Sequence, residues 1–329
     1  MKTFSNTNAR TPREASSRSS QARAAGKSAV FAGGGSDLLA LVKDRIISPD
    51  VVVNLKTMAN LNEVSRSVSG VTIGGQMTLD SLASHEIIRR DYAVLAEAAN
   101  SVATPQIRNV GTIAGNVCQR PWCWYYRNGF PCFKAGGNQC FSFAGENQFH
   151  AIFGGGPSYI VHPSDTAPAL VALNASFRII GAGGERRVPA AEFFVLPRQD
   201  AAHENVLAED DVLVSIDVPA AKPGTRSTYQ KVLDRQAWTH AVVGAAVVLE
   251  MDQQVCLAAR IVLGGVAPIP WRLPRVEEML VGQSITEDLA TRAAEASIAG
   301  ARALSKNAYK LPLTAGVVRR TLMEMVRPA

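Results

Sequence analysis

The chain has 329 residues, of which 47% are apolar and 19% are charged. This composition is typical of a globular protein with two or three domains and excludes bulk disorder. The net charge of +6 comes mostly from the first 30 residues, and the remaining charges nearly balance, so we expect no nucleic-acid-binding face. The longest apolar run, residues 241–249, is too short to cross a membrane, so no membrane span is expected.

The N-terminal segment is basic and rich in serine, and two interpretations of it remain open. The favoured one is a solvated start that leads into the first strand. The other is an organelle transit peptide, because such peptides are rich in Arg and Ser and poor in acidic residues. The segment lacks the apolar core of a secretory signal. We therefore expect a cytoplasmic protein, or a periplasmic one if a partner subunit carries an export signal.

The first predicted elements surround a glycine turn. Residues 29–31 predict a strand, and the sequence Gly-Gly-Gly-Ser at 33–36 interrupts it. Residues 37–43 have the spacing of a helix, and the β-branched residues 51–53 predict another strand. A weaker helix is predicted near 60–67.

The next part of the chain combines predicted helices with a long irregular segment. A strand is predicted at 71–73, followed by a helix that Thr78 caps and that runs to about Arg90, and by a second helix at 92–102. Residues 104–165 are rich in Gly, Cys, Asn and aromatic residues and show no sustained period. Such a segment in a compact domain is usually functional.

Shorter elements are predicted after the irregular segment. Residues 159–161 predict a strand, and Ser164 caps a helix that runs to residue 173. Two short segments, 177–180 and 185–188, flank Gly-Ala-Gly-Gly and predict a hairpin. Residues 212–218 alternate as a strand does.

The last third of the chain is predicted as a separate α+β unit. The sequence Ala-Ala-Lys-Pro-Gly at 220–224 predicts the boundary. Beyond it we expect three strands and then three helices: strands at 228–233, 241–251 and 255–263, and helices near 275–281, 286–302 and 312–326. The fold class of the whole chain is therefore α+β.

Two glycine-rich motifs are candidates for anion binding. The first is Ala32-Gly33-Gly34-Gly35-Ser36-Asp37, where a turn between strand and helix leaves backbone N–H groups free. A purely structural turn is an equally good interpretation of this motif alone. The second is the stretch 104–116, where two glycines four residues apart suit close approach of the backbone to a phosphate or a flat ring.

A third motif, His-Pro-Ser-Asp at 162–165, lies where a predicted strand ends and a helix begins. Asp165 could accept hydrogen bonds from ribose hydroxyls. A simple helix cap explains the same residues.

Five motifs together resemble one family. In chain order they are AGGGSDLL (32–39), TPQIRNVGTIAGN (104–116), HPSDTAPAL (162–170), YQKVLDR (229–235) and LGGVAPIPWR (263–272). From about residue 28 to its end, the chain resembles the FAD-binding medium subunit of the molybdenum hydroxylases. That family includes xanthine and aldehyde dehydrogenases and the carbon monoxide dehydrogenase flavoprotein. Each motif alone is weak, but five in this order are specific.

The resemblance implies a fold and its boundaries. Residues 1–222 would form an FAD-binding domain of the type found in p-cresol methylhydroxylase (PCMH-type), with subdomains at about 1–56 and 57–222. A Cys-rich insertion would occupy 118–150. Residues 223–329 would form a smaller α+β domain of the carbon monoxide dehydrogenase flavoprotein type, with a three-stranded antiparallel sheet and helices.

The resemblance also implies which residues contact FAD. Gly34, Gly35 and Ser36 would hold phosphate, as would Thr112, Gly115 and Asn116. Asp165 would bind near the adenosine ribose, Leu213 would pack near the flavin, and Lys231 would approach the polar edge of the flavin. The full set carried over by position is Ala32, Gly33, Gly34, Gly35, Ser36, Asp37, Thr104, Ile107, Gly111, Thr112, Gly115, Asn116, Ser164, Asp165, Leu213 and Lys231. Many relatives have AGGT in the first motif, where this chain has an extra glycine and Ser36.

Four of the five cysteines lie close together in the sequence. Cys118, Cys123, Cys132 and Cys140 are separated by four, eight and seven residues. Four thiolates can hold Zn²⁺ or an iron–sulfur cluster. This spacing does not identify the metal, and unpaired thiols in a loop remain an alternative.

The resemblance suggests a metal centre for these cysteines. Some relatives, such as 4-hydroxybenzoyl-CoA reductase and the periplasmic aldehyde oxidoreductases, carry a [4Fe–4S] cluster in an insertion at this place. Cys123, Cys132 and Cys140 match three of its ligands. The fourth ligand of those relatives lies further on, where residues 148–159 of this chain contain no cysteine. Cys118 is therefore expected to complete the set.

Other residues are given structural roles at this stage. Cys256 is predicted to be a core thiol. His150, His203 and His240 show no ligand spacing, so surface or capping roles are expected. Trp122, Trp124, Tyr125 and Tyr126 would either shield a cluster from water or form a subunit contact.

The resemblance implies an FAD-containing electron-transfer subunit. Its partners would be a molybdopterin-binding large subunit and a [2Fe–2S] small subunit, and electrons would pass through FAD to NAD⁺, O₂ or another acceptor. We find no nucleophile–base pair, so no catalytic residue is expected on this chain. Two alternatives remain: a self-sufficient flavin oxidoreductase with its own substrate pocket, and a non-enzymatic Cys₄ metal module.

Overall fold

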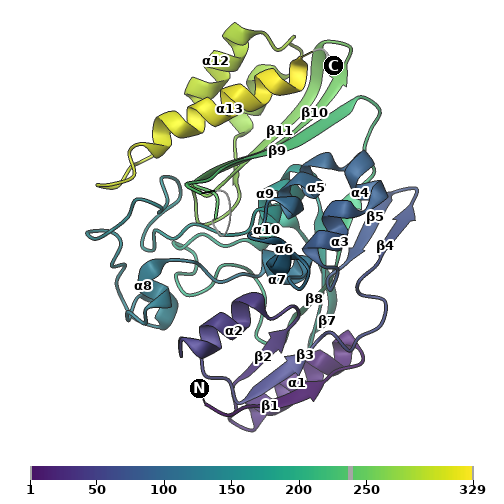
Figure 1. The fold of residues 1–329 in the computed structure, drawn as a ribbon, viewed down its shortest axis with the longest axis vertical. Coiled ribbons are helices and arrows are strands. Elements are labelled where there is room, and N and C mark those ends of the chain that lie inside the picture. Colours follow the sequence, from purple (N-terminus) through teal and green to yellow (C-terminus); the bar gives the residue numbers. More distant parts are fainter. Residues whose placement is uncertain (1, 236–239, 328–329) are drawn as a thin grey trace.

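The computed structural model describes residues 2–235 and 240–327 and contains three sheets arranged along the length of the molecule (Figure 1). The α+β class is confirmed. Its strands are β1 Ser5–Asn8, β2 Ala29–Ala32, β3 Val51–Asn54, β4 Val64–Ser67, β5 Gly70–Gly74, β6 Ser176–Gly181, β7 Gly184–Pro189, β8 Val212–Pro219, β9 Thr225–Val232, β10 Val243–Asp252, β11 Val255–Gly264 and β12 Trp271–Arg272.

Helices pack against these sheets and connect their strands. They are α1 Pro12–Ala24, α2 Ser36–Lys43, α3 Leu79–Ser84, α4 Glu86–Asp91, α5 Ala93–Asn100, α6 Pro105–Arg108, α7 Ile113–Val117, α8 Trp124–Arg127, the 3₁₀ turn η1 Phe133–Ala135, α9 Thr166–Ala172, α10 Ala190–Phe193, α11 Pro274–Leu280, α12 Glu287–Ala296 and α13 Lys310–Val326.

The N-terminal sheet is parallel, with strand order β1-β3-β2. The N-terminal segment is therefore neither a solvated start nor a transit peptide, because it forms β1 and α1. Ala9 and Ala15 are fully buried, and α1 turns Ser16 and Ser19 inward. The excess positive charge of this segment is partly paired, for example Arg18 with Glu14 one turn away.

The central sheet is antiparallel, with strand order β4-β5-β8-β6-β7. The hairpin of β6 and β7 and the strand β8 are confirmed. The helix expected near 60–67 is wrong. Residues 64–67 instead form the edge strand β4, which pairs with β5. Gly70, with a φ of +138°, lies at the start of β5, where the hairpin between β4 and β5 turns.

One expected helix is divided in the structure, and one expected strand is missing. The helix expected from Thr78 to Arg90 is divided into α3 and α4 at His85, which has extended backbone (φ −65°, ψ 126°), and a separate α5 follows. The strand expected at 159–161 is absent from the described structure, where this stretch has no strand partner. Only the carbonyl of Tyr159 is engaged by a neighbouring loop, through the N–H of Ala151.

The C-terminal sheet explains the longest apolar run in the chain. The three expected strands are present, and the two-residue β12 adds a fourth in the order β12-β11-β10-β9. Along β10, Ala246 and Val248 face the core shared with the central sheet, whereas Val247 and Leu249 face α11, α12 and α13. A strand buried on both faces is apolar throughout. Figure 1 shows α12 and α13 lying across this sheet.

Candidate FAD site and the adjoining cysteine insertion

The first glycine motif forms a turn between β2 and α2. Gly35 adopts a left-handed φ of +77° as the residue before α2, a conformation that glycine adopts without strain. No side chain caps α2, so the N–H groups of its first turn remain available to an anion.

The second glycine motif contains two short helices, α6 and α7, where the sequence predicted none. Thr104 caps α6, and Thr112 caps α7 by accepting a hydrogen bond from the N–H of Gly115 at 3.2 Å. The two motifs touch through their backbones. A Cβ added at Gly34 would lie 2.0 Å from the carbonyl oxygen of Val110. Glycine at position 34 therefore permits this contact between the two loops.

Together the two motifs line one cavity of about 310 Å³. Its lining includes ten of the predicted FAD contacts: Gly33, Gly34, Gly35, Ser36, Asp37, Ile107, Gly111, Thr112, Gly115 and Asn116. Ala32 ends β2 just before it. A second cavity, of about 290 Å³, adjoins at Ser36, Asp37 and Ile107 and is also lined by Asp165. The cradle of backbone N–H groups and small side chains has the chemistry that a pyrophosphate requires.

Buried polar side chains support the second motif from behind. The side-chain oxygen of Asn116 accepts hydrogen bonds from the hydroxyls of Ser164 and Thr166, each at 2.6 Å. Ser164 also caps α9 through the N–H of Ala167. Ser164 therefore holds Asn116 in place and does not line either cavity.

Asp165 is engaged by the C-terminal sheet. Its carboxylate accepts hydrogen bonds from the hydroxyl of Tyr229 at 2.8 Å and from Lys231 Nζ at 2.7 Å. Lys231 also donates to the carbonyl of Ser101. The Asp165 and Lys231 side chains are each only 4% exposed. Burial raises the pKa of Tyr229 well above its usual value, and Asp165 adds to the rise. This triad joins β9 to the segment before α9.

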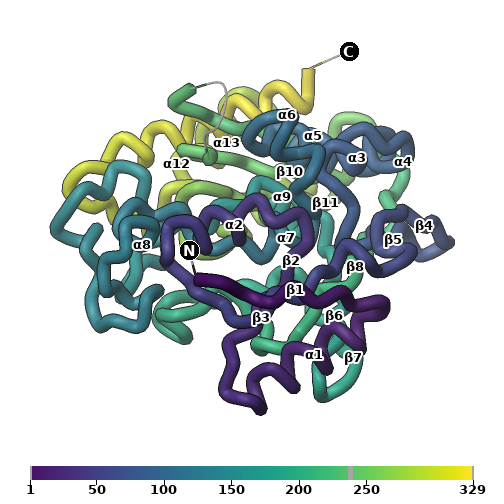
Figure 2. The backbone as a smooth tube through the Cα atoms, turned by 60° about the horizontal axis from the view of Figure 1, so that its bottom comes forward, coloured from purple at the N-terminus to yellow at the C-terminus, as the bar shows by residue number. Residues whose placement is uncertain are grey.

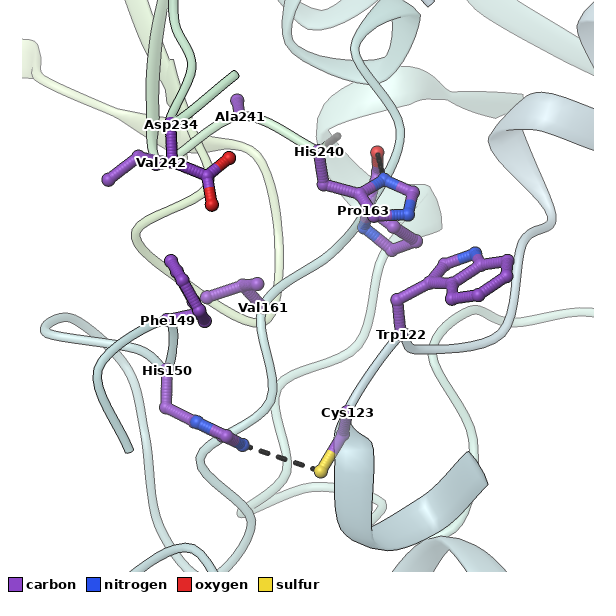
Figure 3. A pocket seen from close by; sticks show the side chains of 10 residues that line it. All are labelled: Trp122, Cys123, Phe149, His150, Val161, Pro163, Asp234, His240, Ala241 and Val242. Carbon is purple, nitrogen blue, oxygen red and sulfur yellow. Dashed lines mark hydrogen bonds between the residues drawn. The ribbon is translucent and has the colours of Figure 1, made fainter. Parts of the chain in front are cut away.

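The remaining predicted residue, Leu213, is buried in β8 within the main core and lines neither cavity. Sequence analysis missed Trp122 and His240 as cavity residues. Both line the second cavity and also a third one of about 220 Å³ (Figure 3). The centroids of their rings lie 5.3 Å apart. No motif marked either residue, because their proximity arises only in the fold.

The Cys-rich insertion is fixed to the first glycine motif by charge. Arg127 pairs with Asp37 at 2.7 Å, and both side chains are largely buried. Asp37 also accepts a hydrogen bond from the N–H of Arg120. At the other end of the insertion, buried Lys134 pairs with buried Glu204 at 2.9 Å. The insertion therefore lies beside α2, as Figures 1 and 2 show around α8.

The four cysteines of the insertion divide into two groups. Cys118 ends α7 and lines the glycine cavity, and burial alone raises its pKa to about 12. Burial also raises the pKa of Cys123 to about 11, and there Cys140 and Cys132 contribute to the rise. Cys123 and Cys132 pack in a small apolar cluster with Leu41 and Tyr126, whereas Cys118 packs against the main core. Within residues 2–235 and 240–327, no three His, Cys, Asp or Glu side chains converge in a ready-made metal site.

The structure gives His150 a partner that the sequence did not indicate. Its Nε2 lies 3.3 Å from the Sγ of Cys123 (Figure 3). Burial lowers the pKa of His150 to about 4, and the positive charge of Lys310 adds to this. The expected surface or capping role for His150 is wrong, because the side chain is buried against the insertion.

Lys310 at the start of α13 is fully buried and donates hydrogen bonds to the carbonyls of Phe149, His150 and Gly265. Burial lowers its pKa to about 7. Between that value and the ordinary lysine pKa of about 10.4, the unfolded chain binds one more proton than the folded chain does. The contribution of Lys310 to stability therefore rises with pH across this window and is lost as pH falls through it.

We expect this dependence to disappear in Lys310→Met. The free energy of unfolding of the unsubstituted chain, relative to that of Lys310→Met, should rise by about 3 kcal/mol between pH 7.5 and 10. Urea unfolding at several pH values measures both, and subtraction removes the titration of all other groups. A difference that stays flat would show that Lys310 titrates normally in the folded chain.

Comparison with known proteins gives the same assignment along the whole chain. Residues 5–221 match the family described as the FAD binding domain in molybdopterin dehydrogenase, and residues 228–325 match the CO dehydrogenase flavoprotein C-terminal domain. The chain is 32% identical to the aldehyde oxidoreductase FAD-binding subunit PaoB of Escherichia coli, covering 100% of this chain and 99% of that one. It is 30% identical to the carbon monoxide dehydrogenase medium chain of Hydrogenophaga pseudoflava, covering 90% and 89%.

Comparison with solved structures gives the same assignment. A chain of carbon monoxide dehydrogenase from Hydrogenophaga pseudoflava matches with a TM-score of 0.77 at 27% identity, covering 98% of this chain and 96% of that one. The chain therefore belongs to the FAD-binding medium subunits of the molybdenum hydroxylases, which are oxidoreductase subunits. Neither the self-sufficient flavin enzyme nor the Cys₄ metal module is favoured. No helix among the described residues is long and apolar enough to cross a membrane.

Proposed function

We propose that this chain is the electron-transfer subunit of a molybdenum hydroxylase of the aldehyde or xanthine type. Its FAD-binding domain would span 1–222 and its second domain 223–329. The observation that carries the proposal is the cavity shared by the two glycine motifs, where backbone N–H groups and small side chains meet. FAD bound there would supply redox chemistry that couples one-electron donors to an acceptor of one or two electrons.

Different residues would bind the pyrophosphate and close the cavity beside it. Gly34, Gly35 and Ser36 would bind the pyrophosphate from one side, and Thr112 and Gly115 from the other. Asn116, held by Ser164 and Thr166, keeps the second side rigid. Trp122 and His240 would close the adjoining cavity and would exclude water from it.

Three predicted contacts are revised within this proposal. Both carboxylate oxygens of Asp165 are already engaged by Tyr229 and Lys231, so Asp165 would hold the two domains together beside the cofactor. Lys231 would hold Asp165 in place beside the second cavity through this ion pair. Leu213 would support the site from the core.

The proposed partners are a molybdopterin-binding large subunit and a [2Fe–2S] small subunit, with NAD⁺, O₂ or another acceptor receiving the electrons. A [4Fe–4S] cluster on this chain would use Cys118, Cys123, Cys132 and Cys140, and these thiols would have to move together to bind it, because no three such side chains form a ready-made metal site in the described residues. Without an export signal on a partner, the complex would remain in the cytoplasm.

Purification of the complex from its native cells tests this function. We expect two further subunits to co-elute with the chain in equal amounts, together with molybdenum, iron and about one FAD per chain. Metal analysis and mass spectrometry of the eluted subunits provide the measurement. A chain that elutes alone, with FAD but without molybdenum-containing partners, would instead indicate a self-sufficient flavin enzyme.

A further inference from the structure

Gln119 lies where the two cavities of the FAD site meet. Among the described residues, the glycine cavity and the second cavity share five lining residues: Ser36, Asp37, Val102, Ile107 and Gln119. Val102 and Ile107 are apolar, so side-chain hydrogen bonds to a ligand at this junction have to come from the other three. Gln119 belongs to neither glycine motif, and no role has been assigned to it.

The amide oxygen of Gln119 is buried and unpaired. Within residues 2–235 and 240–327, its Oε1 has no hydrogen-bond partner. Leaving a buried amide oxygen unpaired is costly, and such groups in folded proteins nearly always have a partner. Because the side chain lines both cavities, a ligand that occupies them can supply the missing donor.

The backbone on either side of Gln119 is fixed. Cys118 ends α7 and donates its N–H to the carbonyl of Ala114 at 3.0 Å. Arg120 donates its N–H to the carboxylate of Asp37 at 3.2 Å. These two contacts hold the backbone of Gln119 beside both cavities, so its amide is positioned before any ligand arrives.

The other two polar residues at the junction have different roles. Both carboxylate oxygens of Asp37 are engaged, one by Arg127 at 2.7 Å and the other by the N–H of Arg120. Ser36 is the first residue of α2, where the free N–H groups would bind phosphate. Gln119 therefore brings an uncharged, unpaired acceptor to this point.

The ligand group beside Gln119 Oε1 must donate a hydrogen bond. A pyrophosphate at neutral pH only accepts hydrogen bonds, so it does not satisfy this oxygen. In FAD the pyrophosphate is joined to the ribityl chain on one side and to the ribose of adenosine on the other, and both carry hydroxyl groups. Whichever of them extends from the glycine cavity into the second cavity brings a hydroxyl to the junction. An amide oxygen can accept from such a hydroxyl.

We infer that Gln119 is an FAD-binding residue whose amide oxygen accepts a hydrogen bond from a hydroxyl group next to the pyrophosphate. This inference rests on the proposed FAD function and adds a contact that the glycine motifs do not include. With it, the site binds a hydroxylated chain beside the pyrophosphate as well as the pyrophosphate itself.

Titration of the apo chain with FAD, followed by flavin fluorescence, tests the inference. We expect Gln119→Met to weaken FAD binding about tenfold, because a buried hydroxyl of the cofactor loses its acceptor. The apo variant should resist urea at least as well as the unsubstituted chain does, since methionine keeps the length of the side chain and removes the unpaired amide.

Gln148→Met is the matched control. Gln148 also has a buried Oε1 without a partner in the described part of the chain, but it lines none of the three cavities. The same substitution there should leave the affinity for FAD unchanged.

Deoxygenated probes identify the hydroxyl. If it belongs to the ribityl chain, Gln119→Met weakens the binding of FAD but not of ADP, and FAD that lacks this one hydroxyl binds both chains equally. If it belongs to the ribose, Gln119→Met weakens ADP binding as well, and 2′,3′-dideoxy-ADP binds both chains equally. Either result supports the inference.

The inference is overturned if Gln119→Met binds FAD as tightly as the unsubstituted chain does. It is also overturned if the loss persists with every deoxygenated probe, because the amide then contacts another part of the cofactor. A clearly less stable apo variant overturns it too, since a structural role of the amide then explains the lost affinity. These outcomes leave the FAD function intact, whereas an unsubstituted chain that binds neither FAD nor ADP would contradict the proposed function itself.

Discussion

Gly34→Ala is expected to lower the FAD content of the purified chain from about one per chain to less than about a tenth of that. The new methyl group would lie 2.0 Å from the carbonyl oxygen of Val110 and 2.7 Å from its carbon. These are backbone atoms, which cannot rotate away as the end of a side chain could. The two glycine motifs would have to separate, and the backbone N–H groups that face the cavity would lose their arrangement.

The measurement is the FAD released from the denatured chain, determined by absorbance after gel filtration. Gly183→Ala is the matched control, because it lies at the β6–β7 turn with open space around the added methyl group, and it should keep its FAD. Circular dichroism of both variants reports whether they are folded. Stoichiometric FAD in a folded Gly34→Ala chain would contradict the assignment of this cavity.

Asp165→Asn is expected to lower the free energy of unfolding by about 3–5 kcal/mol, because it removes one partner of a buried ion pair and leaves Lys231 charged without a counter-ion. The loss should appear in the apo chain, where FAD binding does not contribute to stability. Urea unfolding of the apo chain measures it.

Two further variants make this second result specific. Lys222→Met breaks an exposed pair with Glu250 and should cost less than about 1 kcal/mol. Adding Lys231→Met to Asp165→Asn should recover part of the lost stability, since no uncompensated charge then remains. Equal, small losses in Asp165→Asn and Lys222→Met would show that the Asp165–Lys231 pair does not hold the two domains together.

Much of the fold could be predicted because its signals are local. The hairpin of β6 and β7 has a glycine turn between two short segments, and β10 is apolar from Val243 to Leu249 because both of its faces are buried there. Helix α1 gave no such signal, since the side chains it buries are Ala and Ser rather than a stripe of large apolar residues. Strand β4 was also missed, because it is an exposed edge strand whose identity depends on pairing with β5.

The candidate site also has one part that local sequence shows and another part that only the fold shows. The glycine motifs are contiguous in sequence, and the cavity brings together most of the residues carried over from the family. The partners of Asp165 lie 64 and 66 residues away, so no local pattern could show that its carboxylate is engaged. His150 is 27 residues from Cys123, at no recognisable ligand spacing, and only the fold shows that they meet.

The absorption spectrum of the anaerobically purified chain tests the central claim most directly. We expect flavin bands corresponding to about one FAD per chain, retained through gel filtration and released on denaturation. A chain that shows no flavin bands, even after refolding with excess FAD, would contradict the assignment of the two glycine motifs as an FAD site.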